Sequence, residues 1–132
     1  MTHTQRNERT AVGRLRGVLL VNAGFSAVTG AILLLGADVA GWLGVPAPVG
    51  LALGAGLVLF AVAVLAAAFR APTSSAGAVV MADTAWVGGA LVILLAFPSL
   101  LSPSGRWSLA GVTVVVAVLA CLQWRWLRLA GV

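Results

Sequence analysis

The sequence predicts an all-α protein, a membrane-embedded four-helix bundle whose helices run up-down-up-down with both termini on the cytoplasmic side. Three observations lead to this prediction: four long apolar runs, few charged residues, and arginines that gather at one side of the runs. Hydrophobic residues make up 61% of the 132 residues and charged residues only 8%. A water-soluble domain of this size needs far more polar surface.

Each apolar run is long enough to cross a bilayer. The uncharged stretches contain 21 residues after Arg16, 31 after Asp38, 22 after Asp83 and 18 after Arg106. A helix of roughly 20 residues spans a hydrocarbon core of about 30 Å, and backbone groups in lipid must be hydrogen-bonded within the segment. We therefore predict one domain over residues 1–132, with a flexible tail at 1–10 and spans at about 17–37, 49–69, 78–98 and 107–124.

The arginines predict the orientation. All eight basic residues are arginine, and with a cytoplasmic N-terminus seven of them lie inside and only Arg106 lies outside. Basic residues that flank spans favour the cytoplasmic side and attract anionic lipid headgroups there. Because the arginines flank the runs and form no stripe on a folded surface, we do not expect a nucleic-acid partner.

The connections between the runs are short and rich in helix-ending residues. Segment 38–48 predicts a brief interfacial helical turn that two prolines end, and Ser102 is expected to cap the last helix, with Pro103 at its first position. The first run exceeds the length of a signal-peptide core, so we expect it to be retained as a helix. Gly50-x-x-x-Gly54 and Ala52-x-x-x-Gly56 give the second span a smooth face for helix contact.

Asp83 is the only acidic residue within a predicted span. A charged side chain at the centre of a membrane helix costs about 2.5–3.5 kcal/mol on insertion scales, so it should face protein or water. Asn22 in the first span and Gln123 in the fourth are expected at a similar depth, and Arg16 and Arg125 are within reach of the carboxyl group.

Further candidate binding residues follow from helical spacing. Trp86 lies three residues after Asp83, and Phe25 and Ser26 lie three and four residues after Asn22, so each group shares a helix face. Two interpretations stay open for this set. It is a structural cluster of interhelical hydrogen bonds, or it is a site for a ligand or a proton.

No motif of a catalytic or cofactor-binding site is present in the sequence. Cys121, the only cysteine, is expected to be a buried small hydrophobe, and together with His3 it cannot make a metal-ligand set. We expect neither a metal nor a cofactor. If the protein is an enzyme, Asp83 is its only candidate catalytic residue, as a general acid.

Several short stretches resemble a family of uncharacterised short bacterial membrane proteins with four helices, broadly similar to DoxX-type proteins. The stretches are Asn22-Ala23-Gly24-Phe25-Ser26-Ala27, Asp83-Thr84-Ala85-Trp86-Val87, Gly105-Arg106-Trp107 and Leu122-Gln123-Trp124. The resemblance implies a multi-pass protein of the bacterial inner membrane. It implies no activity.

The sequence is consistent with three hypotheses for function. The first is a non-catalytic protein that binds a lipophilic small molecule or a membrane partner through a polar pocket near Asn22 and Asp83. The second is a membrane-embedded enzyme that uses Asp83 as a general acid on a lipophilic substrate. The third is a proton-coupled small-molecule exporter that works as a homo-oligomer.

Overall fold

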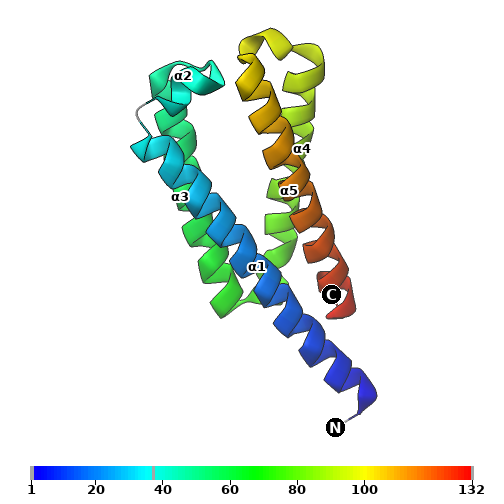
Figure 1. The fold of residues 1–132 in the computed structure, drawn as a ribbon. Helices are drawn as coiled ribbons and strands as arrows, with labels where there is room; N and C mark the ends of the chain where they lie inside the picture. Colours follow the sequence, from blue (N-terminus) through cyan, green and yellow to red (C-terminus); the bar gives the residue numbers. More distant parts are fainter. Residues whose placement is uncertain (1, 37, 132) are drawn as a thin grey trace.

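Four long helices make up most of the molecule (Figure 1). The computed structural model describes residues 2–36 and 38–131. The long helices are α1 (His3–Leu35), α3 (Ala47–Arg70), α4 (Pro72–Ala96) and α5 (Pro103–Leu129), and the short elements are α2 (Val39–Leu43) and the 3-10 turn η1 (Pro98–Leu100). No strand occurs among these residues, and all four long helices are long and apolar enough to cross a membrane. The prediction of an all-α protein with four long apolar helices is confirmed.

The helices are longer than the predicted spans, and their ends differ by a few residues. The first predicted span ends at residue 37, which lies outside the described residues, whereas α1 ends at Leu35. The third predicted span runs to 98, whereas α4 ends at Ala96. The physical reason is Pro98, because the residue before a proline is disfavoured in the helical region.

Residues 3–10, which we expected to form a flexible tail, belong to α1. The signal for this helix start is a capping box. The Thr2 side chain accepts a hydrogen bond from the Gln5 backbone N–H, and the Gln5 side chain accepts one from the Thr2 N–H, both at 3.2 Å. Every residue from 2 to 10 is exposed, so local capping, not packing, starts this helix.

The turn that contains α2 is fastened to the start of α5. Ser102 Oγ accepts the Gly105 N–H at 3.0 Å, as predicted, and it also donates to the Trp42 carbonyl. The Ser102 backbone N–H donates to Leu43 O at 3.2 Å. Gly44 has a φ of 80°, a left-handed conformation that glycine adopts without strain. These bonds join the first interhelical connection to the last long helix.

Helix α1 is the central helix of the bundle. It packs most extensively against α3 and also contacts α4 and α5, while α4 and α5 pack closely on each other. A buried core joins all four helices, and its members are Leu15, Leu19, Ala23, Val64, Ala68, Ala76, Val79 and Leu127. In Figure 1 the pair α1–α3 and the pair α4–α5 diverge toward the upper end of the drawing.

Glycines let α1 and α3 approach each other closely. A Cβ atom added to Gly30 would lie 2.8 Å from the Gly54 carbonyl oxygen, which is too close for a real contact. Gly50 is also buried, and it lies against Ala40 of α2. The two predicted small-residue pairs therefore separate: Gly50 and Gly54 pack inside, while Ala52 and Gly56 are exposed.

Apolar side chains cover the outside of the bundle, as a lipid-solvated protein requires. Leu35 is 85% exposed and Leu95 is 81% exposed. Tryptophans stand near the helix ends, where Arg128 lies over Trp124 at 5.8 Å, and Arg14 and Arg125 lie over Trp126 at 5.6 and 5.5 Å. Such rings act as anchors at the membrane interface.

The contact between Gly30 and Gly54 generates a first prediction. The change Gly30→Ala should destabilise the protein by about 1–3 kcal/mol, because the new methyl group forces α1 and α3 apart. The matched control is Gly24→Ala in the same helix, where an added Cβ meets nothing within 4 Å. Thermal unfolding of purified protein in detergent measures both. Equal effects of the two changes would contradict the close contact.

Candidate functional site

Asp83 lies at the centre of a buried polar cluster that joins three helices. Its Oδ2 atom accepts a hydrogen bond from Asn22 Nδ2 of α1 at 2.8 Å and one from Gln123 Nε2 of α5 at 3.2 Å. Asp83 is 4% exposed, Asn22 1% and Gln123 0%. The three polar residues that the sequence placed at a similar depth are therefore brought together.

Each helix presents its polar residue on the face that it buries. In α1 the buried positions 11, 15, 19, 22, 23, 26 and 30 form one stripe, and in α4 they are 76, 79, 83 and 90. In α5 the buried positions 113, 116, 119, 120, 123 and 127 repeat at intervals of three and four. This is the spacing of a helix face that packs on neighbours, so the polar residues occupy core positions.

Ser26 extends the cluster by one turn of α1. Its hydroxyl group donates to Asn22 Oδ1 at 3.4 Å, so both ends of the Asn22 amide have partners. Thr29, one turn further, instead donates to the Phe25 carbonyl at 2.8 Å within its own helix. The cluster therefore ends at Ser26 on this side.

Two buried polar atoms near the cluster have no hydrogen-bond partner among the described residues. They are Gln123 Oε1, an acceptor, and Trp86 Nε1, a donor. A buried polar group without a partner costs about 1–3 kcal/mol, so each such atom in a folded protein requires an explanation. A hydrogen-bonding group of a ligand would supply the partner that such an atom lacks.

The two aromatic candidates lie one helical turn from the cluster. Phe25 and Trp86 follow Asn22 and Asp83 by three residues, and both side chains are half-buried. No hydrogen bond joins either ring to the cluster among the described residues. The aromatic residues therefore adjoin the polar group along the helices without bonding to it.

The arginines do not reach Asp83, contrary to the expectation from the sequence. Arg16 Nε donates to the Ala68 carbonyl at 2.9 Å, near the C-terminal end of α3, and Arg125 lies over Trp126. The last carbonyl groups of a helix lack partners within it, which makes them strong acceptors for a nearby guanidinium. Neutral amides, not cations, surround the carboxyl group.

Cys121, expected to be buried, is exposed. It stands between the buried positions Ala120 and Gln123 on α5, on the side that faces away from the core. Within residues 2–36 and 38–131, no group of three or more His, Cys, Asp or Glu side chains is arranged to hold a metal ion.

Comparison of the chain with protein-family models, curated proteins and solved structures found no match. The class of protein therefore follows from the chain itself, whose four apolar helices are those of a membrane protein.

The cluster generates a second prediction. The change Asp83→Leu should lower the stability by about 1–3 kcal/mol, because it leaves the Asn22 and Gln123 amides without their acceptor. Asp83→Asn should cost less, since its amide oxygen can still accept. Thermal unfolding in detergent measures both.

The matched control for this prediction is Thr84→Val, the adjacent residue. Thr84 is exposed, and its hydroxyl group donates to the Val80 carbonyl of its own helix. If Asp83→Leu were as stable as this control, the hydrogen bonds would have no structural role.

Proposed function

We propose that the chain is a small multi-pass protein of the bacterial inner membrane, similar to the DoxX-type proteins, with helices that run up-down-up-down and both termini in the cytoplasm. The positions of the arginines support this orientation. Figure 1 also supports it, because the N- and C-termini are drawn at the same end of the bundle.

The orientation is testable with reporter fusions. A fluorescent protein fused after Val132 should fluoresce, and an alkaline phosphatase fused there should be inactive, because this enzyme folds only outside the cytoplasm. Fusions that truncate the chain after Val45, between α2 and α3, should give the opposite pair of results. Phosphatase activity at the C-terminus would contradict the proposed orientation.

The proposed function is non-catalytic binding of a lipophilic molecule that carries a hydrogen-bonding group. The observation that carries this proposal is the pair of buried polar atoms without partners, Gln123 Oε1 and Trp86 Nε1. The hydrogen-bonding group of a lipophilic ligand would supply the partner that such an atom lacks, since ligand sites place a few polar groups among apolar ones.

The bonding of Asp83 supports a binding role over a catalytic one. Two amide donors already hold the same carboxylate oxygen, and the residue is 4% exposed. A general acid has to lie within hydrogen-bond reach of the group that it protonates. A carboxyl group buried this deeply is better suited to orient the two amides than to reach and protonate a substrate.

The binding proposal predicts a bound molecule that depends on the indole N–H. An organic extract of the purified protein, analysed by mass spectrometry, should contain a lipophilic compound that is several-fold depleted in Trp86→Phe, because phenylalanine keeps an aromatic ring without a donor. The control is Trp107→Phe, which changes an 81% exposed ring near the start of α5.

Three other experimental results would contradict the binding proposal. The first is an extract that contains no enriched compound, or a compound that is depleted equally in Trp86→Phe and Trp107→Phe. Substrate-driven proton flux in proteoliposomes that disappears in Asp83→Asn would favour the exporter. Turnover of a lipophile that disappears in Asp83→Asn would favour the enzyme.

A further inference from the structure

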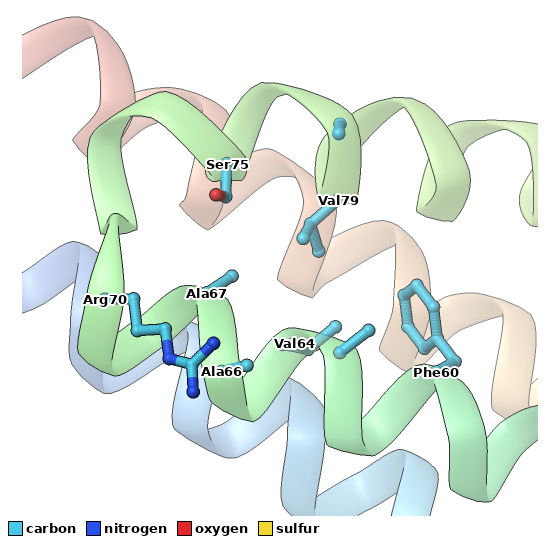
Figure 2. A pocket seen from close by; sticks show the side chains of 9 residues that line it. Phe60, Val64, Ala66, Ala67, Arg70, Ser75 and Val79 are labelled. Carbon is cyan, nitrogen blue, oxygen red and sulfur yellow. The ribbon is translucent and has the colours of Figure 1, made fainter.

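A groove of about 500 Å³ lies between α3 and α4, apart from the polar cluster. Figure 2 shows Val64 of α3 facing Val79 of α4 across it, with Phe60 at one end and Arg70 and Ser75 at the other. The remaining members of its lining are alanines: Ala63, Ala66, Ala67 and Ala78.

The groove exists because α3 and α4 pack lightly on each other. Helix α3 packs mainly on α1, where Gly30 and Gly54 allow close approach, and α4 packs mainly on α5. Alanine side chains along the facing surfaces are too small to fill the remaining space. In a membrane such an apolar opening faces acyl chains, so lipid is the molecule available to fill it.

One end of the groove carries positive charge. Arg70 is the last residue of α3 and is exposed, and no hydrogen bond of its side chain occurs among the described residues. Ser75 contributes a hydroxyl group at the same end, where Figure 2 shows it across from Arg70. Helix α4 begins here at Pro72 without a side-chain cap, so its N-terminal N–H groups add partial positive charge.

We propose that this groove is a binding site for one anionic glycerophospholipid of the surrounding leaflet. One acyl chain lies along the alanines between Phe60 and Arg70, a distance of about 15 Å along the helix axis. The phosphate group accepts hydrogen bonds from the Arg70 guanidinium and the Ser75 hydroxyl group. Guanidinium and phosphate form the strong, charge-assisted kind of hydrogen bond.

Binding in the groove differs from non-specific electrostatic attraction of lipids to arginines, because it requires both the apolar groove and the charge at its end. Arg125 also lies near the ends of the helices, but its guanidinium lies over the Trp126 ring and does not line the groove. A lipid attracted only by the surface potential would respond equally to the loss of either arginine. A lipid held in the groove depends on Arg70.

Native mass spectrometry of the purified full chain tests the proposal. The probes are phosphatidylglycerol and phosphatidylcholine with identical acyl chains, added at equal concentration. The wild type should retain one phosphatidylglycerol with about fivefold preference, and Arg70→Gln should abolish that preference. The matched control Arg125→Gln should keep it. Equal retention of both lipids by the wild type, or equal losses in the two variants, would overturn the proposal.

A second pair of variants tests the groove itself. Ala67→Phe fills the groove and should lower retention of both lipids several-fold. Val62→Phe adds the same ring to α3 at a 60% exposed position outside the groove, and it should have no effect. Unchanged retention in Ala67→Phe would overturn the proposal. If this variant does not fold, Arg70→Gln still tests it, because Arg70 is exposed.

The proposed lipid site is independent of the proposed ligand at the polar cluster. Trp86 and Gln123 do not line the groove, and Arg70 and Ala67 do not bond to Asp83. Loss of the compound in Trp86→Phe with unchanged lipid preference would support the two sites separately. Retention of the compound in Trp86→Phe with unchanged lipid preference would refute only the binding at the cluster.

Discussion

The hydrogen bonds to Asp83 are the interaction on which the rest of the structure depends. A carboxyl group in the middle of a membrane helix has no water to solvate it, so its position is tolerable only where donors from other helices meet it. Asn22 and Gln123 provide these donors, and both bond to the same oxygen. Because they belong to α1 and α5, the bonds hold the two helix pairs in one register and one rotation.

Apolar packing alone determines the register and rotation of helices less well in lipid than in water. Acyl chains are as apolar as leucine, so burial of apolar side chains between helices brings little net gain. Close contact and polar bonds must therefore set the arrangement. The structure uses both: glycine contact between α1 and α3, and amide–carboxylate bonds among α1, α4 and α5. Arg16 adds a third link, from α1 to the Ala68 carbonyl at the end of α3.

The sequence is sufficient to predict the four apolar helices and the similar depth of Asn22, Asp83 and Gln123, because length, charge and depth are properties of one helix at a time. It is insufficient for features that depend on helix rotation. Cys121 and Gln123 differ by two residues, yet one is exposed and the other is fully buried. The Arg16 bond and the groove beside Ala67 depend on which helix lies next to which.

The helical start at His3 could be predicted from Thr2 and Gln5, whose spacing is that of a capping box.

The placement of α3 explains why the bundle is asymmetric. Among the described residues, no polar bond joins α3 to the cluster around Asp83. Helix α3 is linked to α4 by the single residue Ala71 and by a short stretch of contact. The helices α1, α4 and α5 share polar bonds, whereas α3 packs on α1 through its glycines. Helix α3 packs closely on α1 on one side. On its other side no polar bond holds it to α4 among the described residues, so space remains there. The small number of polar residues allows the chain to lie in lipid, and it also leaves α3 and α4 without a polar bond that would close the groove between them.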